Sequence, residues 1–172
     1  VGYKFIGPVK GEMACGEYGE GKMSSPLQVY RELKDYFKTL DLRKKNKFSA
    51  LVTAGPTREY IDPVRYLSNN SSGKQGYEIA KALKNFGIKT TLITGPTNIE
   101  YKKDLKIIKT ISGRDMLSAV KKNMPVDIVI CTAAVADFYP VTLLNSKIKK
   151  DNKNEFNFRL KKNPDILEFL GK

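Results

Sequence analysis

The chain has 172 residues, with 31 lysines and arginines against 18 aspartates and glutamates, no histidine and two cysteines. Without histidine, no Ser-His or Cys-His catalytic pair and no histidine-ligated metal site can form within this sequence. Cys15 and Cys131 are too few and too far apart for a zinc ribbon or a disulfide framework, so we expect a reducing, cytoplasmic setting. No apolar run approaches the roughly 20 residues of a membrane span, and the N-terminus lacks a signal-peptide pattern, so no membrane contact is expected.

The net charge of +13 would suit nucleic acid, an acidic surface or small polyanions as partners. The lysines are scattered along the chain with asparagine frequent beside them, a pattern that codon preference alone also produces. No predicted strand carries the aromatic residues on which single-stranded nucleic acid stacks. The charge therefore does not identify a nucleic acid partner, and nucleic acid binding is disfavoured.

The first 47 residues divide into three stretches of different composition. Residues 1–25 are rich in glycine and proline and show no hydrophobic period, which predicts an irregular segment that needs a larger body to pack against. Residues 26–40 begin near a proline and space their apolar side chains three or four apart, which predicts an amphipathic helix. These side chains are Leu27, Tyr30, Leu33, Tyr36 and Phe37. The polar run 41–47 predicts a linker or a solvated loop.

From residue 48 onward, short β-branched runs alternate with helical stretches, the pattern of a parallel sheet covered by helices. The predicted strands are 48–55, 88–95, 106–111 and 127–137, with a later strand at 156–162. The predicted helices are 73–87, with Gly87 as a C-cap, 112–124, with Ser112 as an N-cap, and a last one that begins after 162. We therefore expect an α/β fold with a Rossmann-like, mostly parallel sheet and helices on both faces, preceded by an irregular segment and a helix.

Two loops follow the carboxyl ends of predicted strands, where ligands bind in open parallel sheets. The first, residues 56–72, is much longer than the usual connection of about two to six residues, and long ordered loops are commonly functional. Its polar residues are Arg58, Asp62, Arg65, Asn69, Asn70, Ser71 and Ser72. It closes with SSGKQG, which opens the 73–87 helix, so free N–H groups, two hydroxyls and Lys74 could surround a phosphate or a carboxylate.

This loop matches neither of two common phosphate motifs. Ser68 stands where a Walker A loop needs its first glycine, and Gln75 follows Lys74 where serine or threonine is required. The G-x-G-x-x-G pattern is also missing. A glycine-bearing loop that only turns the chain into a helix, with Asn69 stabilising a turn, is therefore an open alternative.

The second loop, CTAAVADFYP at 131–140, follows an apolar strand and begins with small residues. Small residues let a ligand approach the backbone closely, and they equally allow tight helix packing. Asp137 could bind ribose hydroxyls or cap a turn. Lys147, in KIKK, lies on a polar loop that could fold over a triphosphate or form a solvated surface. Cys131 follows DIVI and is expected to be a buried small hydrophobe.

Four segments, in this order, resemble the phosphopantothenoylcysteine synthetase domain of the bifunctional coenzyme A biosynthesis flavoprotein family. They are AGPTREYIDPVRYLSNNSSGKQGYEIA (54–80), CTAAVADFYP (131–140), KIKK (147–150) and KNPDIL (162–167). The segment GPVKGEMACGEYGEGKM (7–23) is similar to the end of the decarboxylase domain that precedes the synthetase in the fused enzyme.

The resemblance implies three parts: residues 1–25 as the C-terminal tail of a decarboxylase domain, 26–47 as a helix and linker, and 48–172 as a synthetase domain that is incomplete at its C-terminus. The family continues beyond KNPDIL with a segment that contacts the cytosine base and adds lysines. The choice between CTP and ATP is therefore not readable from these residues. At most feeble activity is expected if 172 residues are all that exist.

The resemblance implies a phosphopantothenate–cysteine ligase. Such an enzyme activates the carboxylate of 4′-phosphopantothenate with CTP to an acyl-cytidylate and then couples it to cysteine with release of CMP. This chemistry needs no histidine, because the carboxylate is already ionised at neutral pH and a metal ion and lysines can spread the phosphate charge. The family further implies Mg²⁺ with the CTP, FMN only through the absent decarboxylase domain, and a homodimer with the long loop near the interface.

The resemblance also implies roles for single residues. Asn69 steadies the acyl-cytidylate, Arg65 helps to bind the acyl substrate, and Lys147 lies on a flap over the phosphates. The implied nucleotide-binding residues are Cys131, Thr132, Ala133, Asp137, Lys147, Ser71, Ser72 and Gly73. Lys74 and Gly76 belong to the same matching loop. Cys15 matches the decarboxylase acid and is expected to be inert in this fragment, since the flavin-binding body is absent.

Two other functions are weighed against the ligase. A non-catalytic nucleotide- or RNA-binding module could retain the same fold, and salt-sensitive RNA binding unaffected by CTP would favour it. NAD(P)-dependent reduction on a similar sheet is disfavoured, because no G-x-G-x-x-G follows the first strand.

Overall fold

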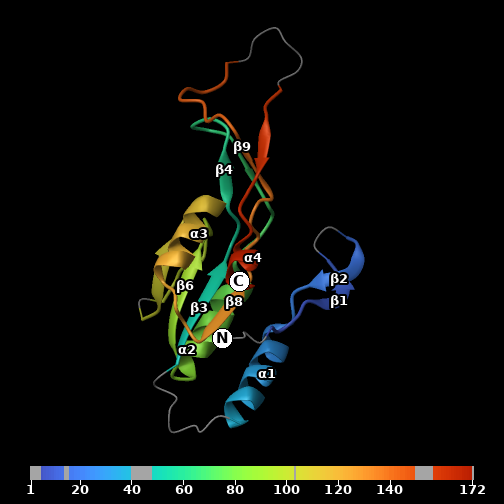
Figure 1. Cartoon of the computed structure of the whole chain (residues 1–172), viewed down its shortest axis with the longest axis vertical. Coiled ribbons are helices and arrows are strands. Elements are labelled where there is room, and N and C mark those ends of the chain that lie inside the picture. Colours follow the sequence, from blue (N-terminus) through green and yellow to red (C-terminus); the bar gives the residue numbers. More distant parts are fainter. Residues whose placement is uncertain (1–4, 14–15, 40–47, 103, 150–156, 172) are drawn as a thin grey trace.

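The computed structural model describes residues 5–13, 16–39, 48–102, 104–149 and 157–171. A parallel sheet with helices forms the body, and a pair of short β-hairpin-like ribbons extends from one end of it (Figure 1). The elements in chain order are β1 (Val9–Glu12), β2 (Tyr18–Lys22), α1 (Pro26–Thr39), β3 (Ser49–Ala54), β4 (Arg58–Tyr60), β5 (Tyr66–Ser68), α2 (Lys74–Asn85), β6 (Lys89–Thr94), β7 (Lys106–Lys109), α3 (Gly113–Lys122), β8 (Ile128–Cys131), β9 (Phe138–Pro140), β10 (Leu160–Lys162) and α4 (Ile166–Gly171).

The central sheet has four parallel strands in the order β7-β6-β3-β8. The chain builds outward from β3 through β6 to β7 and then returns to the other side of β3 with β8. Strand order therefore reverses between β3 and β8, and such a switch point is where doubly wound sheets bind ligands. The predicted Rossmann-like α/β fold is confirmed.

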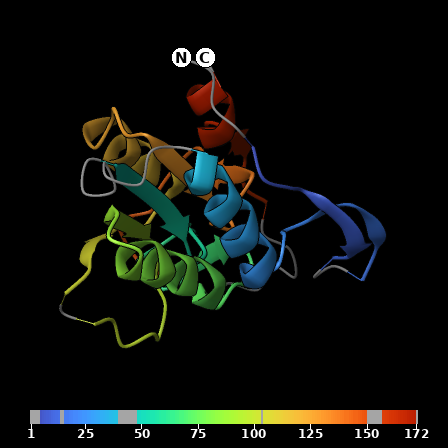
Figure 2. The same cartoon turned by 90° about the horizontal axis from the view of Figure 1, so that it is seen from below.

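Side chains alternate between two cores because successive strand residues face opposite sides of the sheet. Val52 of β3 faces α1 and α2 and is fully buried with Phe37 and Leu83. Leu51, one residue earlier, faces α3 and α4 and is fully buried beside Met116. Figure 2 shows these two pairs of helices on opposite sides of the sheet. The predicted helices on both faces are therefore present.

The predicted N-cap of α3 is confirmed, and the predicted C-cap of α2 is one residue too late. Ser112 caps α3 through a capping box, in which its hydroxyl accepts from the Asp115 N–H while the Asp115 carboxylate accepts from the Ser112 N–H. The C-cap of α2 is Phe86, and Gly87 follows it with φ +86° and donates its N–H to the Lys84 carbonyl at 2.8 Å. These two caps fix where the helices start and stop on the sheet.

The prediction of an irregular segment over residues 1–25 was wrong, because β1 and β2 form an antiparallel hairpin there. Glycines in the second strand hide its two-residue period, but Gly21 also leaves space for Met13, since a Cβ on Gly21 would lie 2.7 Å from the Met13 Sδ. Cys15 lies outside the described residues. The predicted helix over 26–40 is confirmed as α1.

The long loop 56–72 also contains regular structure that the sequence did not indicate. β4 and β5 pair as an antiparallel hairpin, and β9 pairs with β10 beside it. We call these four strands and their connections, residues 58–68, 138–149 and 157–162, the β-arm; Figure 1 shows it extending from the carboxyl end of the sheet. Strands of three residues are too short to show a hydrophobic period. The predicted strand 127–137 is also shorter, since β8 ends at Cys131.

Candidate active site

The candidate site is built at the carboxyl ends of β3 and β8, beside the switch point. The Thr132 N–H and hydroxyl both donate to the Thr53 carbonyl, at 3.0 and 2.6 Å, and the Ala134 N–H donates to the Gly55 carbonyl at 2.9 Å. The two chain segments therefore stay together beyond their last strand residues. We call residues 54–57 and 131–136 the peptide rim.

The N-terminus of α2 lies directly against the peptide rim. Gly73 occupies the N-cap with φ +71°, a conformation that favours glycine, and a Cβ there would lie 3.2 Å from the Gly55 Cα. Gly73 has no side chain to cap the helix, and the Lys74 N–H reaches the Ser72 hydroxyl at a long 3.4 Å. N–H groups of the first turn are therefore able to bind an anion, which the helix dipole also favours.

A cleft of about 650 Å³ opens beside this helix N-terminus. It is lined by Pro56, Arg58, Tyr66, Ser68, Asn69, Asn70, Ser71, Ser72, Lys74, Tyr77, Glu78, Pro96, Thr97, Asn98 and Ile99. Arg58 and Lys74 bring positive charge, and the Arg58 guanidinium carbon lies 4.5 Å from the centre of the Tyr66 ring. The hydroxyls, amides and cations among these lining residues suit a ligand with phosphate or carboxylate groups.

Asn69 joins the cleft to the second predicted loop. It follows β5 directly, is exposed, and donates its Nδ2 to the Val135 carbonyl at 3.0 Å. The hydrogen bond fixes which end of the amide faces the 131–136 part of the rim. The fold therefore brings two groups of predicted site residues together at the carboxyl ends of β3 and β8. They are Asn69, Ser71, Ser72 and Gly73 from the first loop and Cys131, Thr132 and Ala133 from the second.

Cys131 and Asp137 have different surroundings at this edge. Burial raises the pKa of the Cys131 thiol, and the nearby Asp165 charge raises it further, while a hydrogen bond with Thr53 acts in the opposite direction. The thiol is therefore protonated at neutral pH and is not an activated nucleophile. Asp137 is exposed, and its backbone carbonyl accepts from the Asn163 N–H at 2.7 Å.

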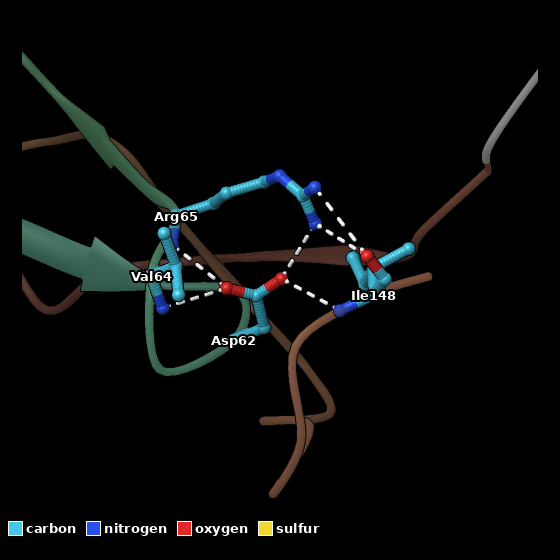
Figure 3. A network of polar contacts seen from close by, with 4 residues as sticks. All are labelled: Asp62, Val64, Arg65 and Ile148. Carbon is cyan, nitrogen blue, oxygen red and sulfur yellow. Dashed lines mark hydrogen bonds and ion pairs between the residues drawn. The ribbon is translucent and has the colours of Figure 1, made fainter. Parts of the chain in front are cut away.

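Arg65 and Lys147 do not lie beside Asn69 in this chain. Arg65 precedes β5 and Asn69 follows it, which separates their Cα atoms by about 13 Å along an extended strand. Arg65 instead contacts Asp62 and the carbonyl of Ile148, the residue after Lys147 (Figure 3). The structure therefore brings Arg65 to the backbone next to Lys147, at the turn of the β-arm and away from the peptide rim.

The sequence-based prediction missed the wall of the cleft formed by the loop after β6. The tripeptide Gly-Pro-Thr follows β3 at 55–57 and β6 at 95–97. This repeat could have indicated that both loops contribute to the cleft. A Cβ on Gly95 would overlap the Pro56 carbonyl, so the two turns are in close contact. The Thr97 hydroxyl lies 2.5 Å from the Tyr101 hydroxyl, which also contacts the Thr94 hydroxyl at 3.0 Å.

Two further residues were missed because their roles depend on tertiary contacts. Glu59 is 2% exposed and accepts the Gly113 N–H of α3 at 2.8 Å. Asn163 is also buried and donates its Nδ2 to the Ala136 carbonyl at 2.7 Å. Glu59 thus holds the start of α3, and Asn163 holds the 131–136 part of the peptide rim.

The described part of the chain holds no group of three His, Cys, Asp or Glu residues that could bind a metal ion. None of its helices has the length and hydrophobicity needed to cross a membrane.

Comparison with known proteins connects this geometry to a family. The Coenzyme A biosynthesis bifunctional protein CoaBC of Haemophilus influenzae is 43% identical over 172 residues, which are 99% of this chain and 42% of that protein. The crystal structure of the C-terminal domain of a CoaBC protein superposes with a TM-score of 0.61 and 41% identity, over 72% of this chain and 58% of that one.

A second solved structure, the DNA/pantothenate metabolism flavoprotein from Streptococcus pneumoniae, has a TM-score of 0.63 and 26% identity, over 72% of this chain and 63% of its own. The chain thus spans less than half the length of the curated relatives that it matches. The family described as the DNA/pantothenate metabolism flavoprotein C-terminal domain matches residues 45–172. With the sheet, the peptide rim and this match in agreement, the chain belongs to the DNA/pantothenate metabolism flavoprotein C-terminal domain family.

Proposed function

We propose that the protein is a phosphopantothenate–cysteine ligase of coenzyme A biosynthesis. One observation carries the proposal: an uncapped helix N-terminus, Asn69 and the peptide rim meet at the switch point of the sheet. That arrangement suits a negatively charged acyl-phosphate intermediate. The relatives named as coenzyme A biosynthesis bifunctional proteins support the same pathway.

The proposed reaction has two steps. The carboxylate of 4′-phosphopantothenate attacks the α-phosphorus of CTP, so that a carbon–oxygen–phosphorus anhydride forms and pyrophosphate leaves. The neutral amine of cysteine then attacks the acyl carbon. The amide forms with loss of one N–H proton to water, and CMP leaves with the electron pair of the broken carbon–oxygen bond. Positioning and electrostatic stabilisation are sufficient for both steps, which is consistent with a chain that has no histidine.

The residues take the following proposed roles. Asn69 and the N–H groups at the start of α2 hold the acyl-cytidylate, with Ser71, Ser72 and Gly73 beside its phosphate. The rim residues Cys131, Thr132 and Ala133 contact the nucleotide through their backbone, and Asp137 contacts its ribose. Arg65 binds the acyl substrate, and Lys147 contacts the CTP phosphates.

Mg²⁺ would enter with the nucleotide. Since no cluster of three acidic, cysteine or histidine side chains occurs among the described residues, the CTP phosphates themselves would provide the ligands that hold the ion. The ion would spread charge on the phosphates.

We assign FMN to the decarboxylase portion of such a bifunctional protein, with Cys15 as its acid, and none of the described residues to FMN binding. A cytoplasmic location fits these charged, phosphorylated substrates.

We also propose a homodimer and the division into residues 1–25, 26–47 and 48–172. Apolar side chains exposed on the β-arm support the homodimer, because a second copy could bury them. They are Val64, Tyr66, Phe138, Val141, Leu143, Phe158 and Leu160, with exposed fractions between 40% and 59%.

The match of the flavoprotein C-terminal domain family to residues 45–172 supports a domain boundary near the start of β3.

The test uses the protein that carries this sequence, incubated with 4′-phosphopantothenate, cysteine, CTP and Mg²⁺. Formation of phosphopantothenoylcysteine with an equal amount of CMP is expected. Leaving out cysteine should stop CMP release but not the first formation of pyrophosphate. Salt-sensitive RNA binding without CMP release would instead favour the non-catalytic binding module.

A further inference from the structure

Asp62, in the turn between β4 and β5, is a carboxylate whose side chain is 0% exposed. Its Oδ1 accepts the N–H groups of Val64 and Arg65, at 2.7 and 2.8 Å. Its Oδ2 accepts the Arg65 Nη1 at 2.7 Å and the Ile148 N–H at 3.1 Å (Figure 3). One oxygen therefore closes the turn, and the other joins the turn to a segment 86 residues away in sequence.

Further contacts join the same two segments. The Arg65 Nη1 and Nη2 each lie 3.4 Å from the Ile148 carbonyl, so the guanidinium and the carboxylate of Asp62 hold Ile148 from both sides of its backbone. The Leu144 N–H donates to the Ile61 carbonyl at 3.0 Å. Lys147 lies between these two points of attachment and is itself exposed.

The charge state of Asp62 agrees with this arrangement. Burial alone would raise its pKa, but the amides of Ile148, Val64 and Arg65, together with the Arg65 charge, lower the pKa from 3.8 to about 2. The carboxylate is therefore ionised at neutral pH and accepts all of these hydrogen bonds at once.

We propose that Asp62 is a positioning residue that holds Arg65 and Lys147 as one cationic unit for the two anionic substrates of the proposed ligase. This inference rests on the proposed function for its catalytic consequence, but its structural part stands on the contacts alone. Asp62 contacts neither substrate in this assignment; it acts through Arg65 and through the backbone beside Lys147.

An asparagine at this position separates the two functions of the carboxylate. The amide oxygen of Asp62→Asn can still accept the Val64 and Arg65 N–H groups and keep the turn. Its Nδ2 would then face two donors, the Arg65 Nη1 and the Ile148 N–H, and could accept neither. Asp62→Ala removes both sets of bonds, so comparison of the two variants separates loss of the turn from loss of the connection to Ile148.

The first measurement is amide hydrogen exchange at Ile148 in the unliganded protein. Asp62→Asn should make this amide exchange at least about tenfold faster while the amides of β3 and β6 keep their protection. Asp104→Asn is the matched control, because Asp104 also pairs with a cation, Lys84 at 2.6 Å, but is exposed and lies outside the β-arm. Unchanged exchange at Ile148 in Asp62→Asn would overturn the inference whether or not the protein is a ligase.

The second measurement is steady-state kinetics. Asp62→Asn should raise KM for CTP and for 4′-phosphopantothenate about tenfold and leave KM for cysteine unchanged. Wild-type KM values for both anionic substrates, despite faster exchange at Ile148, would also overturn it. Absence of activity in the wild-type protein would count against the proposed function, while the exchange experiment would still decide the role of Asp62.

Discussion

At the residue scale, substitution of Asn69 should affect one step of the reaction, because its side chain connects the cleft with the peptide rim. Asn69→Asp cannot donate to the Val135 carbonyl and adds a negative charge beside the proposed anhydride. We expect pyrophosphate formation to persist and formation of the amide product to fall about 100-fold, as for loss of an oxyanion-stabilising donor. Rapid-quench measurement of pyrophosphate and product separates the two steps.

The matched control for Asn69 is Asn123→Asp. Asn123 also donates its Nδ2 to a backbone carbonyl, that of Ala119 at 2.8 Å, but it lies at the end of α3. This variant should keep both steps. Equal loss of both steps in Asn69→Asp would contradict the assigned role, since it would indicate failed substrate binding rather than failed coupling.

At the element scale, the contact between α2 and β3 depends on Gly76. A Cβ there would lie 2.5 Å from the Ala54 Cβ, inside a fully packed core, so the helix would have to move away from the strand. We expect Gly76→Ala to lower the free energy of unfolding by about 1–3 kcal/mol and to weaken CTP binding, because the α2 N-terminus moves with the helix. Urea unfolding and CTP titration measure the two effects.

Gly171→Ala provides the comparison for Gly76, since a Cβ on Gly171 would meet nothing within 4 Å. Its unfolding free energy should stay within about 0.5 kcal/mol of wild type. If Gly76→Ala were equally neutral, the close contact of α2 with β3 would not be the reason for a glycine at this position.

The β-arm should respond to acid through Asp62. Burial opposes the charged form, but hydrogen bonds and Arg65 lower its pKa to about 2, against an ordinary value of 3.8. Because the folded-state pKa is the lower one, the stabilisation is complete above pH 3.8 and is lost as pH falls through 2. The difference in unfolding free energy between wild type and Asp62→Asn should therefore shrink across that range. A constant difference would indicate that the pKa of Asp62 is the same in the folded and unfolded states.

Elements with a clear period were predictable, and elements stabilised by tertiary contacts were not. The strand ending at Ala54 and the helix capped by Ser112 are defined by local patterns, so both were found from sequence. The β4–β5 hairpin escaped prediction because three-residue strands have no measurable period, and its turn is closed by a carboxylate that also binds Ile148. The closeness of Asn69 and Gly73 to the peptide rim could be expected from their place in the loop after β3, and their binding roles stay predictions.

At the scale of the whole molecule, the distance between Arg65 and Asn69 suggests that one site takes these two residues from different subunits. About 13 Å of extended strand lies between them, and the β-arm that carries Arg65 exposes the apolar side chains proposed to meet a second copy. In such a homodimer, the arm of one subunit can supply Arg65 to the site formed around Asn69 of the other.

Mixing two inactive variants tests this arrangement. Arg65→Ala and Asn69→Ala should each be inactive alone, but a mixed dimer would contain one site with Asn69 from one subunit and Arg65 from the other. After subunit exchange at equal amounts, about half of the dimers are mixed and each has one intact site of two, so activity should return to about a quarter of wild type. If each subunit used its own Arg65, every site would keep a defect and no activity would return. Light scattering should show a dimer throughout, because neither substitution removes the exposed apolar side chains of the β-arm.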